Sequence, residues 1–171
     1  MIQLDKREPV PFSSNPFGLV YENAITENKE NEVQIHLVTY SLNGIKIASN
    51  IYTPKNYNKA KKYPAIVIAV PNGAVKEQAA GLYGKRLAEK GYITIVSDCM
   101  FFGESEGKPR QQDIPYFRNE DIRGMIDAIS SFPGVDSHRI YGLGICGGGG
   151  YMLSCGQMDK RLKKNSNYFH V

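Results

Sequence analysis

The sequence predicts a three-layer α/β fold in which an antiparallel hairpin precedes a set of parallel strands. Residues 32–52 largely alternate apolar and polar side chains around a two-residue turn, which is typical of a hairpin. Residues 63–70 and 92–97 are instead nearly continuous apolar runs, as expected for strands covered on both faces of a parallel sheet. Each run is followed by a helical pattern, and right-handed crossovers then place helices on both faces of the sheet.

The first half of the chain divides at residue 30. Residues 1–30 are rich in Pro, Ser, Asn and Glu and show little periodicity, so we predict an irregular N-terminal arm. The hairpin strands occupy residues 32–40 and 45–52, joined by the turn Asn43-Gly44. After the strand at residues 63–70, the apolar spacing predicts a helix over residues 76–90, with Gly91 at its end.

The second half continues the alternation. The strand at residues 92–97 ends at Asp98, and a helix is predicted over residues 119–131 with Pro133-Gly134 as its stop. Residues 139–143 form the third parallel strand, and Cys146 opens the third helix. We therefore expect a single domain over residues 31–163, followed by a tail of residues 164–171.

Composition excludes several classes of protein. The formal net charge is +4 for 171 residues, and most of the excess lies in the last thirteen residues, so the body is nearly neutral and no nucleic-acid binding is expected. No apolar run is long enough for a signal peptide or a membrane span, and we expect a cytoplasmic protein without membrane contact. The three cysteines, Cys99, Cys146 and Cys155, lack C-x-x-C spacing, so neither disulfides nor zinc are expected, and no cofactor or metal is indicated.

The most informative segment is residues 140–150, where a strand runs into Gly144-Ile145-Cys146-Gly147-Gly148. A nucleophile elbow is a strained strand-to-helix turn, and the positions two before and two after the reactive residue must be small. Gly144 and Gly148 satisfy that requirement around Cys146. A helix N-terminus also favours the thiolate, which is the nucleophilic form of cysteine.

Two other interpretations of this segment remain open. The glycines could simply let a helix pack closely on the sheet, with Cys146 as a small buried apolar residue. Alternatively, Gly142-x-Gly144-x-x-Gly147 fits the dinucleotide-binding pattern, which also needs an acidic residue about 20 positions further on, after another strand. The chain offers only the charged stretch of residues 159–164 there.

Three stretches resemble the α/β-hydrolase superfamily, in particular its dienelactone-hydrolase-like and X-Pro dipeptidyl-peptidase-like branches. Residues 98–107 are similar to the family loop D-x-R-G-x-G-x-S-x-G, with Met100 and Phe101 in place of its Arg and Gly. Residues 135–140 resemble the lead-in to the nucleophile strand, and residues 144–148 match the elbow with Cys in place of Ser. The resemblance implies an α/β-hydrolase-type sheet whose C-terminal strands are missing, because it ends near Lys163.

The resemblance also implies a function. Residues 70–78 are similar to a His-Pro-Gly-Gly-type turn, with Val70 where the family often has His. In the family this turn and the residue after the nucleophile supply the oxyanion hole, which here implies Gly147 together with a backbone N–H near Asn72 or Gly73. The implied reaction is hydrolysis of a small-molecule carboxylic ester, lactone or amide with Cys146 as nucleophile.

The catalytic acid and base are not assigned. His36 is expected to face solvent, His138 to lie at the opposite end of its strand from Cys146, and His170 to lie in the tail. For Asp98 and Glu104, near the carboxyl ends of the strands, a role in bracing a turn is favoured over catalysis.

Without an acid and a histidine we expect little turnover by this chain. We also expect self-association through the exposed edge of the nucleophile strand. The alternative is a non-catalytic remnant or interaction module that pairs through that edge.

Overall fold

The computed structural model describes residues 2–8, 23–25 and 27–163, so the predictions for His170 and for residues 164–171 lie outside the described residues. Strands and helices alternate along most of this part of the chain. Their bounds are β1 (Asp5–Lys6), β2 (Gln34–Leu42), β3 (Ile45–Thr53), β4 (Tyr63–Ala69), α1 (Ala79–Glu89), β5 (Ile93–Ser97), α2 (Pro115–Ser130), β6 (Val135–Gly144) and α3 (Gly147–Met158).

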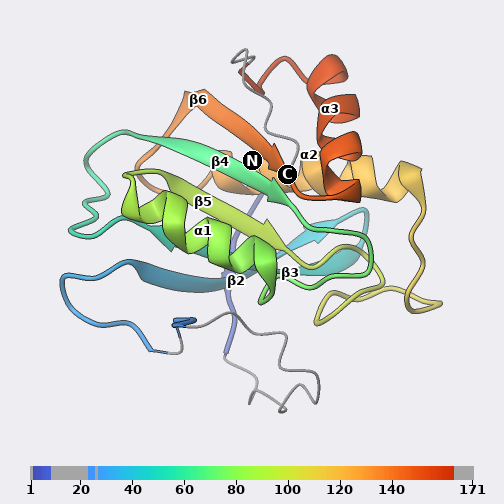
Figure 1. Cartoon of the computed structure of the whole chain (residues 1–171), viewed down its shortest axis with the longest axis horizontal. Helices are drawn as coiled ribbons and strands as arrows, with labels where there is room; N and C mark the ends of the chain where they lie inside the picture. The colour runs from blue at the N-terminus through green and yellow to red at the C-terminus, as the bar shows by residue number, and fades with distance from the viewer. Residues whose placement is uncertain (1, 9–22, 26, 164–171) are drawn as a thin grey trace.

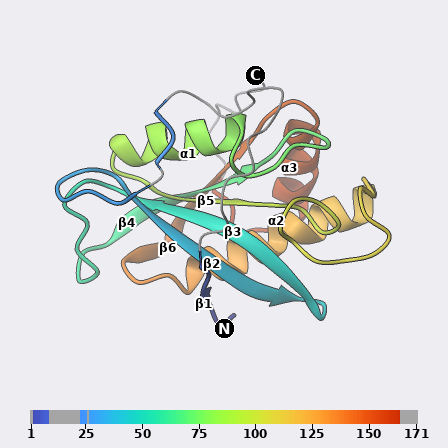
Figure 2. The same ribbon diagram turned by 90° about the horizontal axis from the view of Figure 1, so that it is seen from below.

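The strands form one sheet in the order β1-β2-β3-β5-β4-β6. The pairs β1–β2, β2–β3 and β3–β5 are antiparallel, whereas β4 is parallel to both β5 and β6. Helix α1 covers one face of the sheet and α2 the other, and α3 packs against α2 and β6 (Figures 1 and 2). The predicted three-layer α/β fold is thus confirmed.

The hairpin forms at the predicted turn. Asn43 and Gly44 have φ angles of 52° and 79°, so both adopt the left-handed conformation that a two-residue hairpin turn requires. The turn sets the register, since Leu42 pairs with Ile45 and the ladder continues to Gln34 and Thr53.

The core lies between the sheet and its helices. In α2, Ile122, Ile126 and Ile129 share one face and are almost entirely buried against the sheet. On the parallel strands, Val67 and Ile95 are buried completely. Burial of each such side chain stabilises the fold by about 1.5–3 kcal/mol, which keeps the carboxyl ends of β4, β5 and β6 in fixed positions.

Several boundaries differ from the sequence prediction, and strand β6 begins four residues earlier than predicted. Helix α1 begins three residues later than predicted, because the backbone N–H of Lys76 is bonded to the side chain of Asp98 instead of entering a helix. Helix α2 begins four residues earlier, with Pro115 in its first turn after the extended residue Ile114. Within the predicted irregular arm, the short strand β1 pairs with β2.

Strand β6 lies at the edge of the described sheet, as predicted for the nucleophile strand. After α3, the chain pairs with this edge at one position. Leu162 forms a parallel bridge to Ile140, and the N–H of Lys163 donates to the carbonyl oxygen of Ile140 at 2.8 Å. The chain therefore returns from α3 to the sheet beside β6.

Candidate active site at the carboxyl edge of the parallel strands

Cys146 lies in the tight turn between β6 and α3. Its backbone has φ 53° and ψ −126°, a conformation that costs a non-glycine residue about 1–3 kcal/mol. The side chain is exposed, whereas Cys99 and Cys155 are buried. The strained strand-to-helix turn predicted from the sequence is present, and the interpretation of Cys146 as a buried apolar residue is wrong.

Two glycines allow this turn to pack. A Cβ atom on Gly148 would lie 2.6 Å from the carbonyl oxygens of both Ala69 and Val70, and one on Gly144 would lie 2.6 Å from the backbone nitrogen of Gly149. Real Cβ atoms do not approach backbone this closely, so neither site accommodates a larger residue without a shift of α3. The predicted requirement for small residues around Cys146 therefore has a steric basis.

The turn after β4 brings Asn72 and Gly147 together. The N–H of Ala74 donates to the carbonyl oxygen of Pro71 at 3.1 Å, and Gly73 has φ 74°. The side chain of Asn72 lies directly against Gly147. Its Oδ1 is nearest to the point that a Cβ on Gly147 would occupy, and its Cγ and Nδ2 lie 2.7 and 2.9 Å from that point. The first N–H groups of a helix have no partner within the helix, so the N–H of Gly147 lies at a natural anion-binding position.

A buried ion-pair network fixes the far end of this turn. The carboxylate of Asp98 accepts hydrogen bonds from the backbone N–H of Lys76 at 2.8 Å, from Lys76 Nζ at 2.7 Å and from the backbone N–H of Glu104 at 2.8 Å. Neither Lys76 nor Asp98 exposes its side chain to solvent. The turn-bracing role favoured for Asp98 and Glu104 is the one that the structure shows.

Lys76 is surrounded by negative charge. Its Nζ lies 2.5 Å from Glu104 and 2.7 Å from Glu77, and Arg7 adds a second cation at 2.7 Å from Glu104. Burial alone would lower the pKa of Lys76, but the attraction of Asp98 and Glu77 outweighs it, so its pKa lies above the usual value. Burial also raises the pKa of Glu77.

Arg118 of α2 links three parts of the site, and sequence reasoning missed it. Its Nη2 donates to the carbonyl oxygen of Val70 at 2.6 Å, its Nη1 lies 2.6 Å from Cys99 Sγ, and its guanidinium lies 5.2 Å from the ring centre of Tyr151 in α3. The side chain is only 3% exposed. The available signal was its position four residues before Ile122, on the apolar stripe of α2.

Asp121, one turn further along α2, is a second buried group that sequence reasoning missed. Burial raises its pKa from 3.8 to about 7, against the lowering effects of the Met100 N–H and of Arg118. Its Oδ1 accepts a hydrogen bond from the N–H of Met100 at 3.1 Å, and its Oδ2 is buried with no hydrogen-bond partner among the described residues. The titratable or charged groups around it include Cys99, Arg118, Asp113 and Tyr40.

This carboxyl should make stability depend on pH. Because the pKa of Asp121 is higher in the folded than in the unfolded chain, protonation of this carboxyl favours folding. Its contribution to the free energy of unfolding is therefore complete below pH ~4 and is lost as the pH rises through ~7, with an upper limit of about 4 kcal/mol. Asp121→Asn cannot ionise, and its free energy of unfolding should fall less than that of the wild type between pH 5 and pH 8. Urea unfolding across this range measures the difference, with Asp5→Asn, at an exposed position, as the control. Identical pH profiles for the wild type and Asp121→Asn would contradict the assignment.

The described histidines lie away from Cys146. His36 was expected to face solvent, and this is wrong. The centre of its ring lies 5.3 Å from that of Phe132 and 6.2 Å from that of Tyr57, and its Nε2 forms a 3.0 Å hydrogen bond with Thr53 Oγ1. Burial lowers the pKa of His36. His138 is exposed near the start of β6, whereas Cys146 follows its end, as predicted.

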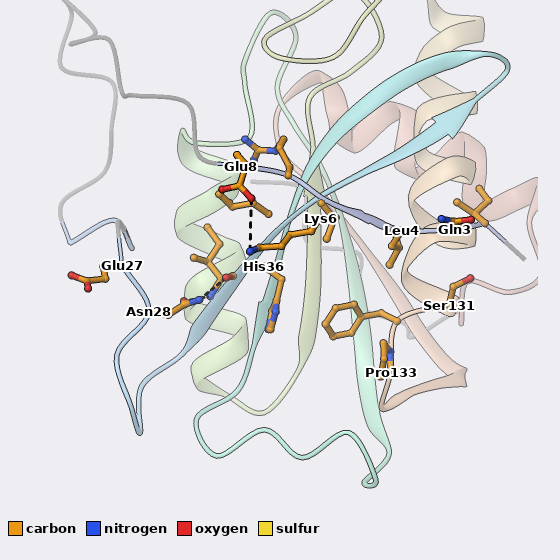
Figure 3. Close-up of a pocket in the computed structure, with 15 residues that line it drawn as sticks. Gln3, Leu4, Lys6, Glu8, Glu27, Asn28, His36, Ser131 and Pro133 are labelled. Atoms are coloured by element: carbon orange, nitrogen blue, oxygen red, sulfur yellow. Dashed lines mark hydrogen bonds and ion pairs between the residues drawn. The ribbon is translucent and has the colours of Figure 1, made fainter.

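A cavity of about 720 Å³ borders His36 (Figure 3). Leu4, Lys6 and Glu8 of the N-terminal arm and Pro133 also line it. Because Pro133 precedes β6 and Cys146 follows it, this cavity and the elbow lie at opposite ends of that strand. The cavity is therefore separate from the candidate active site.

Other types of site find no support in the described ranges. Among these residues, no group of three His, Cys, Asp or Glu side chains is placed to hold a metal ion. None of the helices described is long and apolar enough to cross a bilayer.

Comparisons with known proteins agree with this geometry. Residues 43–130, just over half of the chain, match the family model of the X-Pro dipeptidyl-peptidase (S15 family). A protein of Escherichia coli strain K12 named YcjY is 45% identical over 119 residues, which cover 70% of this chain and 39% of that protein.

Solved structures show the same fold. The crystal structure of the Pseudomonas aeruginosa protein PA2218 has a TM-score of 0.74 at 43% identity and covers 77% of this chain and 41% of its own. A dienelactone hydrolase-like promiscuous phosphotriesterase from metagenomic libraries, P91, has a TM-score of 0.65 at 17% identity, covering 77% of this chain and 57% of its own, and shows likeness of fold alone.

The chain spans well under half of the length of YcjY and PA2218. The match nevertheless includes the hairpin turn, the turn after β4, the loop after β5 and all of α2. With the sheet order and the strained turn at Cys146, it shows that this chain belongs to the X-Pro dipeptidyl-peptidase (S15) family of the α/β-hydrolase superfamily.

Proposed function

We propose that this chain carries the nucleophile and oxyanion hole of a hydrolase that acts on carboxylic esters, lactones or amides, with Cys146 as the nucleophile. The observation that carries the proposal is the backbone of Cys146. Its φ of 53° holds an exposed thiol at the first turn of α3, beside Gly147 and Asn72. A protein gains no stability from a strained non-glycine residue at this point, whereas an exposed nucleophile needs such a turn.

The proposed chemistry follows from that placement. The thiolate of Cys146 attacks the substrate carbonyl carbon, and the carbonyl oxygen takes the negative charge. The N–H of Gly147 donates to this oxyanion, together with a backbone N–H of the Asn72-Gly73 turn. Collapse of the intermediate breaks the bond to the leaving alcohol or amine, which takes a proton from water, and leaves an acyl group on sulfur. A water molecule then hydrolyses this thioester.

The second, hydrolytic step should be slow in this chain. Deacylation needs a base that activates water. In the part of the chain that the structure describes, the two histidines are His36 and His138, and neither is near Cys146. We therefore propose that this chain forms an acyl-enzyme but turns it over little.

The test is a reaction with p-nitrophenyl acetate. We expect about one equivalent of p-nitrophenol per chain, with one acetyl group found on Cys146 by mass spectrometry, followed by a negligible steady-state rate. Cys146→Ala should abolish both signals. The buried thiols of Cys99 and Cys155 serve as internal controls that stay unacetylated. Acetylation elsewhere would contradict the role of Cys146, and sustained turnover that depends on Cys146 would contradict the slow second step.

A further inference from the structure

The side-chain amide of Asn72 occupies a position that a turn does not require. Asn in a turn commonly bonds the backbone two residues further on. Here the amide makes no hydrogen bond to any described residue, and the side chain is exposed. It lies instead against Gly147, where Oδ1 is the amide atom nearest to the point that a Cβ would occupy and Nδ2 lies 2.9 Å from that point. An amide with unused donors therefore lies against Gly147, the first residue of α3.

The turn that carries this amide is held at both ends. Before Asn72, Arg118 donates to the carbonyl oxygen of Val70 at 2.6 Å, and that oxygen also lies against Gly148 of the elbow. After it, the carboxylate of Asp98 accepts the backbone N–H of Lys76. Both Arg118 and Asp98 are buried. Donors that are fixed before the reaction stabilise a developing charge most, because they need no reorganisation.

We propose that the side-chain amide of Asn72 donates a hydrogen bond to the oxyanion that forms at Cys146, in addition to the backbone donors. This deepens the hydrolase function proposed above and rests on it. An amide has both an acceptor and two donors, and a half turn about its last torsion exchanges them. The negative oxygen of the tetrahedral intermediate selects the orientation in which Nδ2 points toward it. Asn72 is then a catalytic residue that contacts the reacting atoms.

Two reactions of the same thiol separate this role from a structural one. Acetylation by p-nitrophenyl acetate passes through an oxyanion. Alkylation by iodoacetamide forms a carbon–sulfur bond at a saturated carbon and expels iodide, with no oxyanion. In Asn72→Ala we expect the rate of Cys146 acetylation to fall by about 10²–10³, the loss typical of one oxyanion donor, while the alkylation rate stays nearly unchanged. Asn72→Asp should resemble Asn72→Ala or react more slowly, since a carboxylate has no donor, and Asn72→Gln should recover part of the rate.

Each outcome decides between the interpretations. An unchanged acetylation rate in Asn72→Ala would overturn the proposal, and so would an equal fall in both rates, which indicates that the turn or the thiol itself is disturbed. If wild-type Cys146 is alkylated but never acetylated, the hydrolase function itself fails, whatever the variants do.

Discussion

Replacement of Lys76 by methionine should lower the free energy of unfolding by about 3–5 kcal/mol, the usual cost of removing one partner from a buried ion pair. Methionine matches the length of lysine but leaves the fully buried carboxylate of Asp98 without its cation. It also leaves Glu104 with Arg7 as its remaining cation, and leaves Glu77 with no ion-pair partner among the described residues. Urea unfolding measures the loss, and Lys59→Met, at an exposed position, is the matched control.

A double variant tests the cause. In Lys76→Met with Asp98→Asn, the buried charge is removed together with its partner, so the combined loss should be clearly smaller than the sum of the two single losses. If Lys76→Met instead loses less than about 1 kcal/mol, or if the two losses simply add, the network contributes no more than ordinary packing.

Replacement of Gly148 by alanine should destabilise the elbow strongly. The added Cβ would lie 2.6 Å from two backbone carbonyl oxygens, which cannot move as a flexible side chain can. We expect α3 to shift away from β4, with a loss of about 1–3 kcal/mol or more in the free energy of unfolding. Because the shift separates Gly147 from the turn after β4, Cys146 acetylation should fall as well.

Gly150→Ala is the matched control, two residues further along the same helix. A Cβ at Gly150 meets no atom within 4 Å, so this variant should be neutral or more stable by about 0.5–1 kcal/mol through its helix propensity. Urea unfolding and the acetylation rate provide the two readouts. Equal effects of the two alanines would show that the close contact at Gly148 is not what limits the site.

Local patterns were enough to predict most of the fold. The turn Asn43-Gly44 determined the hairpin, and the apolar run at residues 63–70 identified the central parallel strand. The elbow could also be predicted, because the collision at Gly144 and Gly148 depends only on residues within the same turn and on the end of the adjacent strand. The hairpin turn and the apolar run are encoded by neighbours in the sequence, whereas the collision at Gly148 is with the end of strand β4.

The charged network could not be predicted in this way. Lys76 has the sequence surroundings of an exposed helix start, and only the tertiary fold brings Asp98 and Glu104 to it from another loop. The same cause moved the start of α1, since the N–H of Lys76 has a side-chain acceptor. For His36, the alternation in β2 indicated the wrong face of the strand as the solvent face. His36 shares its face with the buried Val38, Tyr40 and Leu42. The ring of Phe132, just after α2, also packs against it.

The left-handed backbone at Cys146 has a further consequence. At φ 53°, glycine would relieve the strain, so a sequence shaped by stability alone would have no side chain at this position. The chain already places glycine at the four positions that follow it, and at Gly144 before it. A thiol at the most strained point of a run of glycines is thus a small, permanent loss of stability that packing does not require. Replacement of Cys146 by glycine would thus relieve strain in the fold, but it would remove the residue on which the proposed chemistry depends.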